Sequence, residues 1–317
     1  MRRPLNLLLI LLGLAVVTSG FGRNGHGVPT SKPFFNSKFI EIDKMMLHYR
    51  IWPASGSADT LPWVFMVHGM GGSTWSWEKN APFLSAEGYN VVAVDVPPFG
   101  YSSKNPDFNQ SADSRARLFW DFLERIHPGS VWNLVGHSMG GGIVQAMAII
   151  NPDKVNKVIF VDPALFETLA GEHRYGPSVL KFRPLEWTAA GIGNLFFVRP
   201  GQIRKLLKSA YATEPDPIDI SEYYKSMHQP GFARALIRSS VQSKPAVNLD
   251  GKSFTKPALA IWGDKDTWVP LARMQPLLDK LPSVKISVIA GAGHCPMATH
   301  ADLFNQQVLR FFSEIKK

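Results

Sequence analysis

At 317 residues, the chain is long for one compact core and short for two ordinary domains, so we expect one large domain that carries an insertion. Hydrophobic residues make up 45% of the chain and charged residues 19%, a balance that excludes an intrinsically disordered protein. The net charge of +9 comes from dispersed Lys and Arg residues, with no basic run beside stacking aromatic residues, which argues against nucleic-acid binding and is explained by solubility or by attraction to an anionic surface.

Residues 1–28 are predicted to be a signal peptide or an N-terminal anchor with its linker. Two arginines precede an apolar run from Leu5 to Val17, and small residues follow it, which is the layout of a secretory signal. The run is shorter than the roughly 20 residues that a membrane-spanning helix requires, so a cleaved peptide is favoured over a retained anchor. We therefore expect an exported protein, periplasmic or secreted, with membrane association through this segment as the alternative.

Residues 29–165 and 249–317 are predicted to form an α/β core. A hairpin opens it, with strands at 38–42 and 46–52. Short, continuously apolar strands then alternate with helices, which is typical of a parallel sheet covered on both faces. The further strands are predicted at 63–67, 90–94, 131–135, 157–161, 258–262 and 285–289, and the helices at 76–87, 113–126, 139–150, 271–281 and 302–315. The expected sheet is eight-stranded and mostly parallel.

Residues 166–248 break this alternation. They contain no convincing strand but many aromatic residues and helix-like pieces at 200–211 and 221–227. A bare loop of that length is uncommon in a compact domain, so we predict a helical cap inserted after the sixth strand. The apolar stretch 189–198 could line an acyl pocket in this cap, or it could pack the cap onto the core.

The strongest chemical signal is the pentapeptide Gly-His-Ser-Met-Gly at 136–140, which follows an apolar strand and leads directly into a helix. A serine hydroxyl is a weak nucleophile, so it must be presented on a sharp turn where a base can reach it. Gly136 and Gly140 leave space for that strained backbone, and the helix N-terminus favours negative charge that develops nearby. We predict that Ser138 is a nucleophile.

The loop His-Gly-Met-Gly-Gly at 68–72 directly follows another apolar strand. In a nucleophile elbow, one donor to the oxyanion is the N–H of the residue after the serine, here Met139, and the other donor comes from this earlier loop. We select the N–H of Met70 as the second donor. His68 is expected to hold the loop by hydrogen bonds rather than to react.

A base and an acid are expected from two later loops. His294 lies in a glycine-rich segment between the last strand and the final helix, where it could reach Ser138. A carboxylate that orients its imidazole could come from Asp264 or Asp266, which follow the preceding strand. The neighbouring Cys295 is interpreted as a packing residue rather than a second nucleophile, and as the single cysteine it permits no intrachain disulfide.

With these segments in chain order, residues 38–316 resemble the α/β-hydrolase superfamily, whose triad runs Ser, acid, His. A further match is Asp-Val-Pro-Pro-Phe-Gly-Tyr-Ser at 95–102, which is similar to a turn of that superfamily with Pro98 in place of the usual Gly. The family pattern places the acid three residues after a Gly and so selects Asp266. Asp162, at the end of an earlier strand, is the alternative that some relatives use.

The resemblance implies a class of reaction. Haloalkane dehalogenases and related epoxide hydrolases carry Asp at the elbow, so Ser138 argues against both. Cap-bearing esterases and lipases, carbon–carbon hydrolases of ring-cleavage pathways, perhydrolases and proline iminopeptidases remain similar. Because an exported protein fits ester hydrolysis, we expect a carboxylesterase that forms an acyl-enzyme on a small hydrophobic ester without a metal or organic cofactor. Carbon–carbon hydrolysis is the main alternative, and a non-catalytic ligand-binding homologue is a remote one.

Overall fold

The computed structural model describes residues 32–56, 61–167, 198–242, 249–281 and 283–314. The predicted signal segment 1–28 lies outside these residues, as does the apolar stretch 189–198 except for its last residue. Among the described residues, no helix is both long enough and apolar enough to cross a membrane.

One eight-stranded sheet forms the centre of the molecule, in the order β1-β2-β4-β3-β5-β6-β7-β8. Strand β2 runs antiparallel to both of its neighbours, β1 and β4, and the other neighbouring pairs are parallel. The predicted mostly parallel sheet is therefore confirmed. The strands are β1 (Ser37–Ile42), β2 (Met45–Trp52), β3 (Trp63–Val67), β4 (Asn90–Val94), β5 (Trp132–His137), β6 (Val155–Val161), β7 (Ala258–Gly263) and β8 (Val284–Ile289).

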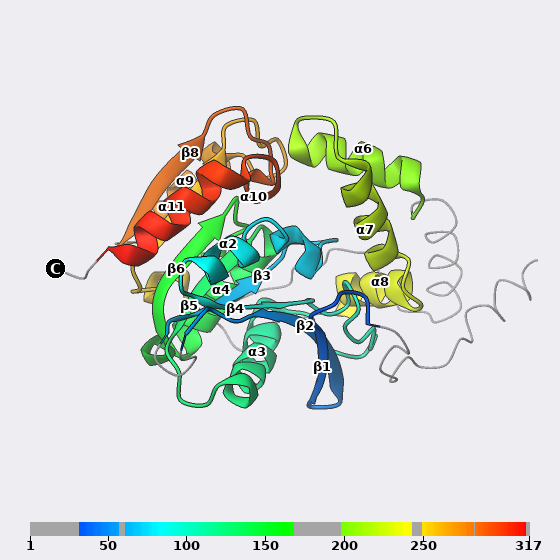
Figure 1. Ribbon diagram of the computed structural model, residues 1–317, viewed down its shortest axis with the longest axis horizontal. Helices are drawn as coiled ribbons and strands as arrows, with labels where there is room; N and C mark the ends of the chain where they lie inside the picture. Colours follow the sequence, from blue (N-terminus) through cyan, green and yellow to red (C-terminus); the bar gives the residue numbers. More distant parts are fainter. Residues whose placement is uncertain (1–31, 57–60, 168–197, 243–248, 282, 315–317) are drawn as a thin grey trace, which may run out of the picture.

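Helices enclose the sheet in the core. Every residue of β3 and β4 is buried, although successive side chains of a strand point to opposite faces, so both faces of the sheet centre are covered. Helix α3 packs on α4, and α2 lies against α11 (Figure 1). The helices of the core are α2 (Ala81–Ala86), α3 (Ala112–Ile126), α4 (Met139–Ile150), α9 (Leu271–Leu278), α10 (Pro296–Thr299) and α11 (Ala301–Ser313).

One predicted helix of the core is wrong in form. Instead of one helix over 76–87, the chain makes a short 3-10 turn at Thr74–Trp77 and then α2. Pro82 lies in the first turn of α2, where its missing N–H leaves no helical bond unmade, and it thereby marks a new helix start. The turn places residues 73–77 directly after the loop 68–72.

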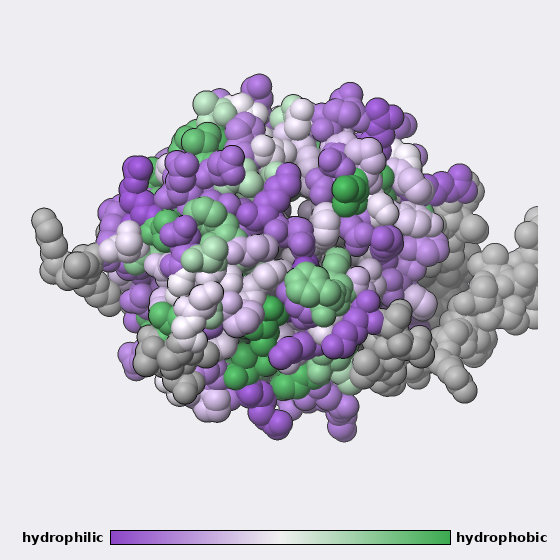
Figure 2. Space-filling model, viewed as in Figure 1, coloured by the Kyte–Doolittle hydropathy of each residue, from purple (hydrophilic) through white to green (hydrophobic). Residues whose placement is uncertain are grey.

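The described part of the predicted cap is helical. It contains α6 (Pro200–Tyr211), α7 (Pro217–Met227) and α8 (Phe232–Gln242), of which α8 was not predicted. These helices stand together at one end of the core, apart from α9 and α11 (Figure 1). On the face shown in Figure 2, hydrophilic residues are spread over the core and these helices, and hydrophobic residues form several separate patches. The cap limits of 166 and 248 stay a prediction.

Candidate active site

Ser138 lies on the turn between β5 and α4, where the motif predicted it. Its φ of 51° and ψ of −118° are strained for a residue with a side chain, and such strain is typical of functional sites. A Cβ at Gly136 would lie 2.4 Å from the carbonyl oxygen of Gly140, and a Cβ at Gly140 would lie 2.2 Å from the carbonyl oxygen of Val67. Both glycines are therefore required by close backbone approach, as expected.

The structure brings the predicted base and acid together. His294 Nδ1 and Asp266 Oδ2 are 2.8 Å apart, and both side chains are buried. Asp266 Oδ1 accepts hydrogen bonds from the backbone N–H groups of Trp268 and Val269 at 2.7 and 3.1 Å. Burial raises the pKa of Asp266, but the hydrogen bond with His294 and the two backbone donors outweigh it, so the pKa is lowered. Asp264 instead accepts from the N–H of Gly291 and is exposed.

The ring of His294 is held from several sides. His137 Nε2 donates to the carbonyl oxygen of His294 at 2.7 Å, and the two rings are 4.8 Å apart. The indole of Trp268 stacks on the imidazole with centroids 5.4 Å apart, and the N–H of His294 donates to the carbonyl oxygen of Ala210 in α6 at 2.6 Å. Within the described part of the chain, no hydrogen bond joins Ser138 Oγ to His294. Such bonds are often long in free enzymes, so the triad role of Ser138 stays a prediction.

The loop 68–72 passes directly by Ser138, since a Cβ at Gly69 would lie 2.9 Å from Ser138 Cβ. His68 fixes this loop, as expected: its Nδ1 donates to the carbonyl oxygen of Gly69 at 2.7 Å, and its Nε2 accepts from the N–H of Val96 at 2.8 Å. Burial lowers the pKa of His68 to about 4, so the ring is neutral at pH 7. The donor roles of Met70 and Met139 remain predictions.

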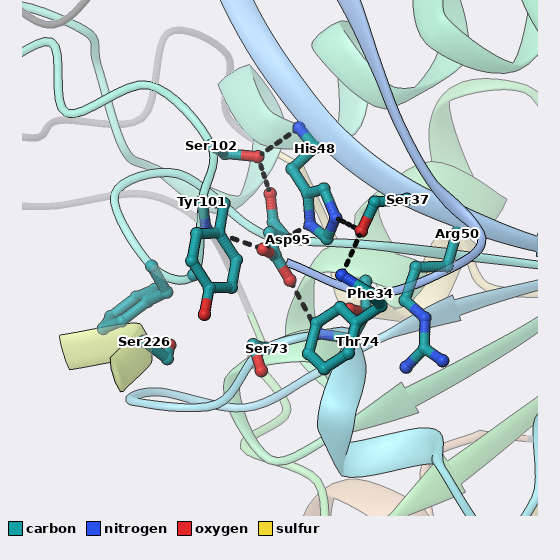
Figure 3. A network of polar contacts seen from close by, with 12 residues as sticks. Phe34, Ser37, His48, Arg50, Ser73, Thr74, Asp95, Tyr101, Ser102 and Ser226 are labelled. Atoms are coloured by element: carbon teal, nitrogen blue, oxygen red, sulfur yellow. Dashed lines mark hydrogen bonds and ion pairs between the residues drawn. The ribbon is translucent and has the colours of Figure 1, made fainter. Parts of the chain in front are cut away.

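Asp95 ties the turn at Thr74–Trp77, which follows the loop 68–72, to the rest of the core (Figure 3). Its Oδ1 accepts from the N–H of Thr74 at 2.6 Å, and its Oδ2 accepts from the N–H of Tyr101 and from His48 Nδ1, each at 2.7 Å. His48 Nε2 in turn lies 2.8 Å from Ser37 Oγ. Burial raises the pKa of Asp95, but His48, His68 and the N–H of Tyr101 lower it to about 2, so the side chain is a carboxylate. This explains why the 95–102 turn begins with an acid.

Arg115 of α3 was missed by the analysis of the sequence. Its Nε and Nη2 donate to the carbonyl oxygen of Pro97, Nη2 also donates to Gln110 Oε1, and Nη1 contacts the sulfur of Met139 at 3.4 Å. None of these partners is a carboxylate, and burial lowers the pKa of Arg115 to about 9. Its position four residues before Phe119 could have indicated that it is buried, because residues four apart share one face of a helix and Phe119 is buried.

Two further residues lie around the base. Asp162, at the end of β6, is buried but does not bond to His294; its Oδ1 accepts from the N–H of Gly263 at 3.0 Å. Asp162, Asp266 and His294 each place one polar atom within 4.8 Å of the other two. Three such atoms could also hold a metal ion. Because His294 Nδ1 already bonds to Asp266, we assign the group to proton chemistry. Cys295 is buried, and burial raises the pKa of its thiol well above the usual range, which fits a packing role.

The mostly parallel sheet and the strained serine between a strand and a helix are those of the α/β-hydrolase fold, and the protein is a hydrolase of this fold. The family model described as alpha/beta hydrolase fold matches residues 62–189. The chain is similar to 2-hydroxy-6-oxononadienedioate/2-hydroxy-6-oxononatrienedioate hydrolase 1 of Dechloromonas aromatica (strain RCB), with 28% identity over 291 residues that cover 87% of this chain and 95% of the relative.

Solved structures agree on the fold. A serine hydrolase involved in carbazole degradation superimposes with a TM-score of 0.68 and 20% identity, covering 87% of this chain and 98% of the other. A membrane phospholipase A, described as a bacterial virulence factor, gives a TM-score of 0.66 and 22% identity, with 98% of each chain covered. At such identities, these likenesses show the fold alone.

Proposed function

We propose that the protein is a serine hydrolase that cleaves a carbon–carbon bond beside a ketone in an acid substrate. The compound class is the 2-hydroxy-6-oxo dienedioate that appears in the names of its curated relatives. This proposal moves the carbon–carbon reaction ahead of ester hydrolysis, because the relatives that align with most of the chain are named for it. It keeps the expected roles of Ser138, His294 and Asp266.

The surroundings of Arg115 carry the proposal, because no carboxylate among the described residues bonds to its buried guanidinium. An ion buried without a partner of opposite charge loses several kcal/mol of hydration energy. The guanidinium lies against the sulfur of Met139, the residue next to the nucleophile, and its protein partners are carbonyl, amide and thioether groups. A substrate carboxylate that displaced the Met139 side chain would supply the missing negative charge. A dioate substrate brings such a group, whereas a simple ester does not.

The residues then act in a defined order. Ser138 Oγ adds to the ketone carbon while His294 takes its proton, and the N–H groups of Met70 and Met139 stabilise the oxyanion. When the oxyanion collapses, the carbon–carbon bond breaks, and its electron pair passes to the departing carbon, which takes the proton from His294. Water, deprotonated by His294, then attacks the acyl-enzyme and releases the acid and Ser138. Asp266 stabilises the imidazolium at each step.

The test follows loss of dienol absorbance with 2-hydroxy-6-oxononadienedioate as substrate. We expect turnover that Ser138→Ala abolishes. Arg115→Gln should lower kcat/KM on this dianion about tenfold or more, since hydrogen bonds to charged groups contribute roughly 1.5–3 kcal/mol. Arg117→Gln, on an exposed position of the same helix, is the matched control and should leave kcat/KM unchanged. No turnover of the dienedioate by the folded wild type would overturn the proposal.

A carboxylesterase is the second candidate, and one observation favours it. Met70 is 67% exposed and Trp268 is 38% exposed, although both flank the site, so they offer apolar surface to a neutral acyl chain. The predicted export segment points the same way. The discriminating measurement is hydrolysis of p-nitrophenyl esters from acetate to palmitate. A higher kcat/KM on these esters than on the dienedioate, with no effect of Arg115→Gln, would favour the esterase.

A further inference from the structure

Only one of the two carboxyl oxygens of Asp162 accepts a hydrogen bond from a described residue. The side chain is fully buried, and its backbone has a φ of 40°, which is strained for a residue other than Gly. Oδ1 accepts the N–H of Gly263, whereas no donor group among the described residues bonds to Oδ2. A buried polar atom that accepts no hydrogen bond lowers the stability of the fold. Its presence in a native structure therefore calls for an explanation.

The unused oxygen belongs to a group that lies beside the triad acid. Polar atoms of Asp162, Asp266 and His294 are within 4.8 Å of one another. Two buried carboxyl groups this close do not both ionise, because each charge opposes the other. Asp266 has three donors that stabilise its charge, and Asp162 has one. Asp162 is therefore the neutral member. Burial, followed by the charge of Asp266 and a hydrogen bond to the Asp266 carboxylate, raises the pKa of Asp162 well above its usual range.

We propose that Asp162 is a reserve acid for His294: it keeps a proton while Asp266 is a carboxylate, and it ionises to stabilise the imidazolium when the charge of Asp266 is absent. Asp162 is thus a positioning residue that acts through His294. The other ionisable groups around it are Cys295, beside the base, and His137, at the end of the neighbouring strand β5. Both are buried, and burial lowers the pKa of His137 to about 3 and raises that of Cys295, so both are neutral at pH 7. The inference rests on the proposed serine chemistry but not on which bond is cleaved.

The experiment compares four full-length proteins: the wild type, Asp162→Asn, Asp266→Asn and the double variant. The readout is the rate at which a fluorophosphonate labels Ser138, which needs the base but no knowledge of the natural substrate. Asp162→Asn keeps the acceptor for Gly263 and should react within about threefold of the wild type. Asp266→Asn should lose about 10- to 100-fold, and the double variant about 10⁴-fold, the usual loss when a triad has no acid.

A pH profile separates this role from a structural one. In Asp266→Asn, labelling should increase as the pH rises through the pKa of Asp162, because only the ionised carboxylate stabilises His294. That increase should be absent from the double variant. It is tested in Asp266→Asn without any change at Asp162, so poor folding of an Asp162 variant does not obscure it.

Two outcomes overturn the inference while leaving serine hydrolysis intact. The first is equal labelling of Asp266→Asn and the double variant at every pH, and the second is a loss in folded Asp162→Asn as large as that in Asp266→Asn. A wild type that the fluorophosphonate does not label would instead refute the nucleophilic role of Ser138, and the reserve acid with it.

Discussion

Replacing Asp95 by Asn tests how the turn that follows the loop 68–72 is held. The pKa of Asp95 is about 2 in the folded protein against an ordinary 3.8, which corresponds to roughly 2 kcal/mol of stabilisation. Because the folded pKa is the lower one, this contribution is complete above about pH 4 and is lost as the pH falls toward 2. Asn also offers an N–H₂ group to donors, so at least one of them, such as the N–H of Thr74, loses its acceptor at about 1–3 kcal/mol.

We therefore expect Asp95→Asn to lower the free energy of unfolding by about 3–5 kcal/mol at pH 7, and to lower kcat as the loop loosens. Urea denaturation followed by tryptophan fluorescence measures the first effect. Asp153→Asn, at an exposed position, is the control and should shift the urea midpoint little. The stability difference between wild type and Asp95→Asn should shrink below pH 4. An unchanged midpoint, or a difference that stays constant down to pH 2.5, would refute this account of the network.

Three other predictions concern packing and burial. Gly140→Ala should prevent accumulation of folded protein. Gly201→Ala is the control, because a Cβ there meets nothing within 4 Å, and it should leave the thermal midpoint unchanged or higher. Equal midpoints for the two variants would contradict the close approach at Gly140. Lys157→Met should lower the free energy of unfolding by about 1–3 kcal/mol, since Nζ donates to three carbonyl groups at the end of α11. Lys285→Met is the control: it removes an exposed ion pair and should lower the free energy of unfolding by under about 1 kcal/mol. Cys295 should resist a thiol reagent in the native state and react in urea, and rapid native labelling would show that it is accessible.

The sheet was predictable because its central strands are buried on both faces. Strands such as β3 and β4 are unbroken apolar runs, so their limits follow from the sequence alone. Helix α8 was missed because it lies among segments without strands, where no alternation marks its limits. The predicted helix at 76–87 is wrong because Pro82 lies in the first turn of a new helix and not inside a continuous one.

The site divides in the same way. Ser138, Asp266 and His294 lie in short motifs at strand ends, so their positions could be predicted from spacing. The surroundings of these residues depend on segments that are far apart in the chain: Arg115 meets Met139 from another helix, and His48 reaches Asp95 across 47 residues. The closeness of Asp162 to Asp266 and His294 depends on three strand ends together, and no local pattern in the sequence contains it.

The hydrogen bond from the His294 N–H to the Ala210 carbonyl joins the cap to the base. A shift of α6 therefore also shifts the backbone of His294, so the predicted cap and the predicted base are mechanically coupled. An exchange of the cap helices with those of a relative would have to reproduce the carbonyl at the end of α6, whatever side chains line the new pocket. Any change of the predicted cap therefore has to keep the backbone contact between Ala210 and His294.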